Sequence, residues 1–70
     1  MEHYTDFSSS NVTRISYDEL SSTLEVEFIN GSIYQYYDVG MEIWQDFKSA
    51  PSKGQFIHQN LKGHYRYARV

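Results

Sequence analysis

Basic and aromatic side chains alternate near the end of the chain, over residues 53–70. Lysine and arginine neutralise phosphates, and tyrosine rings stack on unpaired bases. This composition is typical of a surface that binds a single-stranded nucleic acid. The alternative is a solvated helix face, followed by a tail whose tyrosines pack on the protein itself. The candidate binding residues are Lys53, His58, Lys62, His64, Tyr65, Arg66, Tyr67 and Arg69.

A second candidate is the pair Tyr34 and Tyr36, two residues apart in a β-rich run. Residues at this spacing lie on the same face of a strand. If that face is open, the two rings form a stacking platform. If helices cover it, the rings belong to the core and their hydroxyls need partners. We expect the structural role, because one face of the sheet must be apolar.

The charges are strongly divided along the chain, although the net charge is only −3. Residues 1–46 contain all nine acids and one base, whereas residues 47–70 contain five bases and no acid. The overall negative charge argues against a protein that binds nucleic acid over its whole surface. The division predicts two electrostatic faces that steer partners of opposite sign.

Several classes of protein are excluded by what the sequence lacks. There is no cysteine, so neither a disulfide framework nor a thiolate metal site can form. His58 and His64 are six residues apart, which is not a same-face helical spacing, so we expect no metal and no other cofactor. No nucleophile or phosphate-loop motif occurs. The carboxylates Glu42 and Asp46 fit a solvated helix face better than an acid/base pair.

We therefore expect a protein that is not an enzyme. The apolar runs are too short to span a membrane. The polar, acidic N-terminus does not resemble a signal peptide. These features predict a cytoplasmic protein that makes no membrane contact.

The elements that position the candidates are organised around a hairpin. Two β-rich runs, Thr23–Ile29 and Ser32–Tyr37, flank Asn30 and Gly31. Asparagine and glycine tolerate the positive φ angles that tight hairpin turns require. This is the strongest local structural signal in the chain.

The register of this hairpin has two solutions. A two-residue loop pairs Phe28 with Ile33 and places a glutamine on the apolar face. A three-residue loop, with Gly31 as a bulge residue, pairs Val26 with Tyr34 and Leu24 with Tyr36. A slip of one residue exchanges the two faces of a strand. We favour the bulged register because it keeps apolar residues opposite apolar residues.

The predicted fold class is α+β: a three-stranded antiparallel meander, then two short helices packed on one face of the sheet. A C-terminal segment follows as an extended tail or an edge strand. We expect residues 1–10 to be a flexible tail and residues 11–70 to form a single domain. Ser52 is a suitable N-cap for the second helix. The remaining predicted elements are a strand at Val12–Tyr17 and helices at Met41–Ser49 and Lys53–Lys62, the second with Phe56, Ile57, Asn60 and Leu61 inside.

An ordered set of short motifs spans residues 9–67. It runs from Ile15-Ser16-Tyr17-Asp18, through Leu24-x-Val26-x-Phe28-x-x-Gly31-x-x-Tyr34-x-Tyr36-x-x-Val39, to Ala50-Pro51-Ser52-Lys53-Gly54-x-Phe56 and Tyr65. This pattern resembles the KTSC domain family, whose hallmark is a central Tyr-x-Tyr. One departure is Gly40, where a proline is expected.

The family is named for its place at the C-terminus of some lysyl-tRNA synthetases, and it also occurs as stand-alone small bacterial proteins. The resemblance implies a small accessory domain that binds RNA or tRNA. We predict that binding occurs through the basic, tyrosine-containing C-terminal surface. The alternative is a protein–protein interaction or homo-oligomerisation module with no nucleic-acid role.

Overall fold

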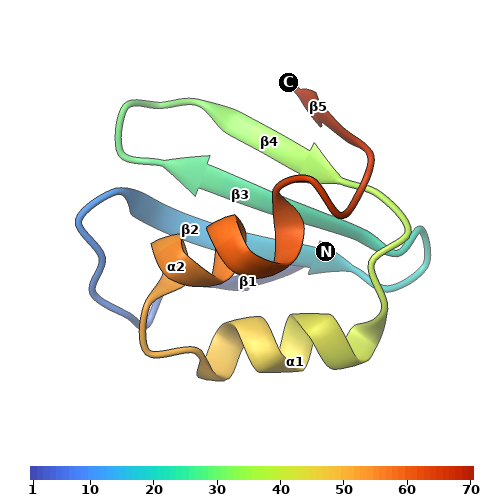
Figure 1. The fold of residues 1–70 in the computed structure, drawn as a ribbon, viewed down its shortest axis with the longest axis horizontal. Helices are drawn as coiled ribbons and strands as arrows, with labels where there is room; N and C mark the ends of the chain where they lie inside the picture. The colour runs from blue at the N-terminus through green and yellow to red at the C-terminus, as the bar shows by residue number, and fades with distance from the viewer.

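The chain folds into one antiparallel sheet with its helices on one face (Figure 1), in a computed structural model that describes all 70 residues. No helix combines the length and the apolar character needed to cross a membrane. The strands follow one another across the sheet in the order β1-β2-β3-β4-β5. The elements are β1 (Glu2–Tyr4), β2 (Val12–Asp18), β3 (Thr23–Phe28), β4 (Ile33–Tyr36), α1 (Met41–Ser49), α2 (Lys53–Phe56), the π-helical turn η1 (Ile57–Leu61) and β5 (Tyr67–Arg69).

The sheet has two strands more than the predicted meander. The three predicted strands form its centre, so the meander is present but incomplete. In place of the tail expected for residues 1–10, Glu2–Tyr4 form β1 and pair with β2. The C-terminal segment is an edge strand, because β5 pairs with β4. Both added strands have three residues, which is too short for an alternating apolar pattern to mark them.

The bulged register of the central hairpin is confirmed. Leu24 lies opposite Tyr36, and Val26 lies opposite Tyr34. Gly31 has a φ of +91°, the left-handed conformation that glycine adopts without steric cost. The N–H of Phe28 donates to the carbonyl of Ser32 at 2.9 Å, which closes a three-residue loop.

The two helical segments lie where the sequence predicts them. α1 has the predicted bounds. The Ser52 hydroxyl accepts the N–H of Gln55, so Ser52 is the N-cap of α2 as expected. The second helix then widens into η1, where the N–H of Lys62 reaches the carbonyl of Ile57 at 2.8 Å. The predicted inner position of Asn60 is wrong, because its side chain is exposed and donates to the carbonyl of Phe56.

The core lies between the helices and one face of the sheet. Trp44 and Phe47 on α1 are fully buried, as are Ile15, Leu24 and Val26 on the sheet. The Trp44 ring stacks on Tyr17 with centroids 5.6 Å apart, and Phe47 stacks on Phe56 at 4.8 Å. Aromatic rings contribute the largest buried area per residue. They compensate for the small volume of a 70-residue core.

The opposite face of the sheet carries a continuous polar network. Arg14 donates to Glu25 at 3.1 Å and to Glu27 at 3.0 Å. Its guanidinium also contacts His3, which bonds to the buried hydroxyl of Ser16. Gln35 extends the network to β4 by donating to Glu25 at 2.9 Å. This face therefore satisfies its own charges.

Glu2 joins β1 to α1. Its carboxylate accepts the indole N–H of Trp44 at 3.2 Å and the ammonium of Lys48 at 3.0 Å. These two bonds, with Lys48 the larger cause, hold the pKa of the Glu2 carboxyl below its usual 4.5. The buried indole of Trp44 thus finds its hydrogen-bond partner in residues 1–10, the segment that we expected to be a tail.

We predict that Glu2→Gln lowers the melting temperature above about pH 5 and that this difference shrinks as the pH falls. A carboxyl whose pKa is depressed by folding stabilises the fold above its unfolded pKa of 4.5. That contribution disappears as the pH falls through the folded value, so the two proteins converge in acid. Thermal unfolding of both proteins across this range measures the difference. A constant difference at every pH would contradict the role given to this carboxylate.

Candidate functional site

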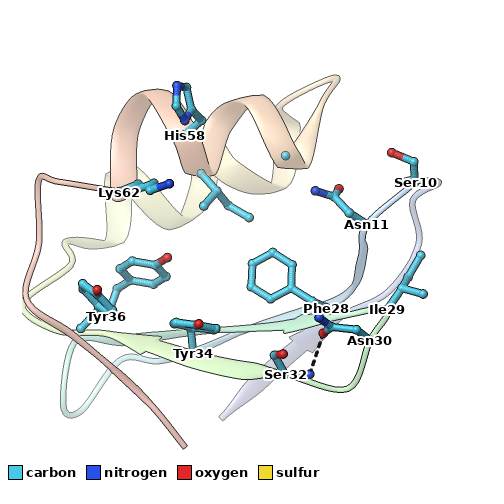
Figure 2. Close-up of a pocket in the computed structure, with 13 residues that line it drawn as sticks. Ser10, Asn11, Phe28, Ile29, Asn30, Ser32, Tyr34, Tyr36, His58 and Lys62 are labelled. Atoms are coloured by element: carbon cyan, nitrogen blue, oxygen red, sulfur yellow. Dashed lines mark hydrogen bonds between the residues drawn. The ribbon is translucent and has the colours of Figure 1, made fainter.

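A groove of about 750 Å³ lies between the second helical segment and the sheet (Figure 2). The sheet side is formed by β3, β4 and β5, and the opposite side by α2 and η1. Phe28 and Tyr34 lie on the sheet side, and Lys62 on the helix side is directed inward. His58 also lines the groove, with its ring directed away from the sheet. The volume falls in the range of sites that hold small organic ligands.

The sheet side of the groove is an aromatic strip. Phe28 meets Tyr34 edge to face, with ring centroids 5.8 Å apart. Tyr67 on β5 then contacts Tyr34 at 6.0 Å and Tyr36 at 5.9 Å. Tyr36 is 5% exposed, Tyr34 is half-buried and Tyr67 is 60% exposed. The strip therefore runs from the core to the surface.

The Tyr36 hydroxyl stays uncharged at neutral pH. Burial raises its pKa above 10.0, and the neighbouring hydroxyls of Tyr34 and Tyr67 add to the effect. A neutral phenol does not repel an anionic ligand. The sequence left two alternatives for Tyr34 and Tyr36, packing in the core or an open face of the sheet. In the structure both tyrosines pack on the core and also line the groove.

The helix side of the groove presents basic groups. His58 and Lys62 are four residues apart and lie on the same side of the helix. On the same segment, Ile57 and Leu61 at the two ends of η1 are buried in the core. Lys62 is exposed, and its ammonium has neither an ion-pair partner nor a hydrogen-bond partner. It is thus a free cation at the groove.

The end of the groove away from Lys62 is polar and uncharged. It is formed by the loop before β2 and by the β3–β4 turn, which contribute Asn11 and Asn30. Gly54 on α2 allows Asn11 to approach closely, since a Cβ at Gly54 would lie 3.2 Å from the Asn11 Oδ1. Ser10 and Ser32 add hydroxyl groups at this end.

Most other cations of the chain are already engaged. Arg14, Lys48 and Arg66 are ion-paired with acids, Arg66 to Asp38 at 2.9 Å. Lys53 is buried. Only Lys62 and Arg69 remain unpaired among the six lysines and arginines.

One unpaired cation lines the groove and the other lies beside it. Lys62 lines it. Arg69 lies opposite Tyr34 in the sheet, so it shares the face of the aromatic strip, and its guanidinium is 3.4 Å from the Ser32 hydroxyl. None of the nine acids lines the groove. The groove is therefore the one hollow of this acidic protein where an anion meets unpaired cations and no carboxylate.

Comparison with known proteins identifies the family. The KTSC domain model matches residues 8–65. The chain belongs to the KTSC domain family. The crystal structure of a KTSC domain protein from Yersinia pestis matches it with a TM-score of 0.85 and 34% identity, over 97% of each chain. The five-stranded sheet and its helices are thus a fold shared with that protein.

Two kinds of relative are similar in sequence to this KTSC domain. An uncharacterized protein of Stutzerimonas stutzeri is 40% identical over 63 residues, which are 89% of each chain. A lysine–tRNA ligase of Nostoc sp. is 39% identical over 54 residues, which are 77% of this chain but only 10% of the ligase. This KTSC domain therefore corresponds to a small segment of the ligase.

Lys53 does not join the basic surface expected from the sequence. Its side chain is 5% exposed, and its ammonium donates to the carbonyls of Lys48 at 3.1 Å and Ala50 at 2.6 Å. These carbonyls end α1, where the helix dipole favours a cation. The ring of Phe7 lies below the ammonium at 5.3 Å. Burial lowers the pKa of Lys53 below 10.5, and the side chain acts as a cap of α1.

Three other predicted residues also lie away from the groove. His64 is exposed in the connection to β5. Tyr65 is half-buried and packs against the core. Arg66 points away from the groove, pairs with Asp38 and lies over the Tyr37 ring at 5.6 Å. Strand alternation separates Arg66 from Tyr67 and Arg69.

Sequence reasoning missed the uncharged end of the groove. Asn30 is visible in the sequence only as a turn residue, and Asn11 only as a residue before a strand. Asn11 reaches the groove because its loop packs beside Gly54, 43 positions along the chain. No local pattern encodes that contact.

We predict that Lys53→Met destabilises this KTSC domain by about 1–3 kcal/mol, because two partly buried carbonyls at the end of α1 lose a charged donor. Urea denaturation measures the free energy of unfolding. Lys48→Met is the matched control, since Lys48 is partly exposed and its ammonium pairs with Glu2 and lies over the Trp44 ring. An unchanged midpoint for Lys53→Met, or a larger loss in the control, would contradict the capping role.

Proposed function

We propose that this KTSC domain is a small accessory binding domain that holds single-stranded RNA, such as an unpaired segment of tRNA, in the groove between the helix and the sheet. The proposal rests on one observation: Lys62 and an aromatic strip line a hollow that no carboxylate lines, and the other unpaired cation, Arg69, lies beside it.

Charge supports an anionic ligand at this place. Phosphate groups would be repelled over much of a surface with a net charge of −3. At the groove they meet Lys62 and His58, and Arg69 lies beside it through its contact with Ser32. Few phosphate contacts are available, so we expect modest affinity and clear salt dependence.

Stacking supports a ligand with unpaired bases. Tyr67 is 60% exposed, and its ring continues the strip made by Tyr34 and Tyr36. Proteins that bind single-stranded RNA place bases on such rings, which accept any base because every base has a π-face. A base-paired helix hides these faces, so the groove favours unpaired nucleotides.

The relatives support testing tRNA first, since the lysine–tRNA ligases carry a similar segment.

Binding fits the groove better than catalysis does. Its lining has one histidine and no carboxylate, so it offers neither a histidine–carboxylate pair nor a pair of carboxylates.

We predict that Lys62→Ala and Arg69→Ala each weaken binding of tRNA and of a single-stranded hexaribonucleotide at low salt. Each change also makes the slope of log K against log salt shallower by about 0.7, because one phosphate contact is lost. Fluorescence anisotropy between about 50 and 200 mM salt measures both effects.

The matched controls are Lys48→Ala and Arg66→Ala, which remove the same charge from residues that are ion-paired elsewhere. We expect them to retain most of the affinity and the full slope. Equal losses in all four variants would mean that only the global charge matters. No binding by the wild type at low salt would refute the proposed function.

We also predict that Tyr67→Ala weakens RNA binding by about fivefold or more without changing the salt slope, since stacking on an aromatic ring is worth about 1–3 kcal/mol per base. The exposed ring contributes little to the core, so the melting temperature should change little. If the wild type binds no RNA, and Tyr67→Ala instead changes the molar mass in light scattering, the protein–protein or homo-oligomerisation alternative is favoured.

A further inference from the structure

Asn30 is the one asparagine of the chain that is followed by glycine. The side-chain carbon of an asparagine can react with the backbone nitrogen of the next residue, and glycine hinders this approach least because it has no Cβ. A Cβ placed at Gly31 would meet nothing within 4 Å, so no other group crowds that side of the turn. Asn30 and Gly31 are both exposed at the tip of the β3–β4 hairpin. The reacting groups and the water that the reaction consumes therefore meet at this turn.

The Asn30 side chain is folded back over the turn. Its Oδ1 atom accepts the N–H of Ser32 at 3.0 Å (Figure 2). This contact makes an Asx turn, in which the side-chain carbonyl lies beside the backbone of the next two residues. When the Gly31 nitrogen adds to Cγ of Asn30, negative charge develops on Oδ1. The Ser32 N–H already donates to that oxygen, so it stabilises the charge.

Another hydrogen bond slows the reaction in the folded protein. The Gly31 N–H donates to the carbonyl of Phe28 at 2.9 Å, so the attacking nitrogen is held by the turn. Exposed loop tips open locally at a low cost in free energy, and this bond breaks in such an opening. The fold therefore makes the reaction slow without preventing it.

The other two asparagines lack these conditions. Asn11 precedes Val12, whose branched side chain is buried and whose N–H donates to the Ser9 hydroxyl at 3.1 Å. Asn60 precedes Leu61, which is fully buried in η1. Each following residue carries a Cβ and is fixed in the core, so attack is hindered at Asn11 and at Asn60.

We propose that Asn30 is a site of spontaneous deamidation that weakens the groove as the protein ages, and the effect on binding rests on the proposed function. The Gly31 nitrogen forms a bond to Cγ of Asn30, the Cγ–Nδ2 bond breaks, and ammonia leaves with the proton from Gly31. Water then opens the resulting succinimide ring to give aspartate or isoaspartate. The sum is one water consumed and one ammonia released, with no oxidant and no reductant.

Both products change the groove. Asn30 lines its uncharged end, and no carboxylate lines the groove before the reaction. Either product adds a carboxylate there, which repels phosphate groups. Isoaspartate also routes the main chain through Cβ and Cγ, which adds an atom to the turn that sets the register of β3 and β4. We therefore expect aged protein to bind RNA more weakly than fresh protein.

The modification is tested by incubating the full chain at a mildly alkaline pH, below its melting temperature, and mapping its peptides by mass spectrometry. We expect the deamidated fraction to rise with time at Asn30 and to stay near its starting level at Asn11 and Asn60. No conversion at Asn30, or equal conversion at all three asparagines, would overturn the proposal. This measurement uses no RNA, so its result is independent of the proposed function.

The effect on the groove is measured by fluorescence anisotropy with single-stranded RNA at about 50 mM salt, before and after the incubation. Once most of Asn30 has reacted, we expect binding to be about threefold weaker or worse, and the loss to shrink at about 200 mM salt because salt screens the added charge. Asn30→Asp, the aspartate product, should show the same loss without incubation.

Asn30→Ser is the matched control, because a serine hydroxyl can accept the Ser32 N–H but cannot form a succinimide. We expect its affinity to be the same before and after incubation. If wild type and Asn30→Ser lose affinity equally, or if converted wild type keeps its affinity, Asn30 does not control the groove and the proposal is wrong. No binding by fresh wild type would refute the proposed function itself, and the peptide map would still decide whether Asn30 is modified.

Discussion

The three-residue turn Ile29–Gly31 fixes how β3 lies against β4, and the rest of the molecule depends on this register. Leu24, Val26 and Phe28 thereby share a face with Tyr34 and Tyr36. The helices cover part of that face and leave the remainder as the groove. A two-residue loop would shift β4 by one residue, so Gln35 would join the apolar face and the two tyrosines would lie beside the glutamates of β3. The turn that sets this register requires a left-handed residue, and Gly31 supplies it.

The distribution of charge follows from the same arrangement. Glu25 and Glu27 on the outer face are held by Arg14, and Glu2 on β1 is held by Lys48. Each engaged pair removes one base from the set that a ligand can use. The basic C-terminal segment is therefore weaker as an anion site than its composition indicates. The unpaired bases that remain in this segment lie near the tyrosine rings.

Long, patterned elements were predictable from the sequence, and short or tertiary ones were not. The bounds of α1, the Ser52 cap and the hairpin register follow from apolar spacing, capping chemistry and burial. β1 was not predictable, because its strand is stabilised by the contact of Glu2 with Trp44, 42 positions away.

The same limit applies to the candidate site. The residues predicted by type include three that line the groove, His58, Lys62 and Tyr67. Arg69, also predicted by type, lies beside the groove. Lys53 was misplaced because nothing in the local sequence distinguishes a buried helix cap from a surface cation. Its burial depends on how α1 and α2 meet.

The strand order also bears on how this fold is joined to other domains. β1 and β5 lie at opposite edges of the sheet, four interstrand spacings or about 19 Å apart. The groove is built on β3, β4 and β5. A polypeptide fused ahead of β1 thus emerges at the edge farthest from β5, and it leaves the mouth of the groove unobstructed. The strand order is thus compatible with attachment of this fold to a larger protein in a way that keeps the groove accessible.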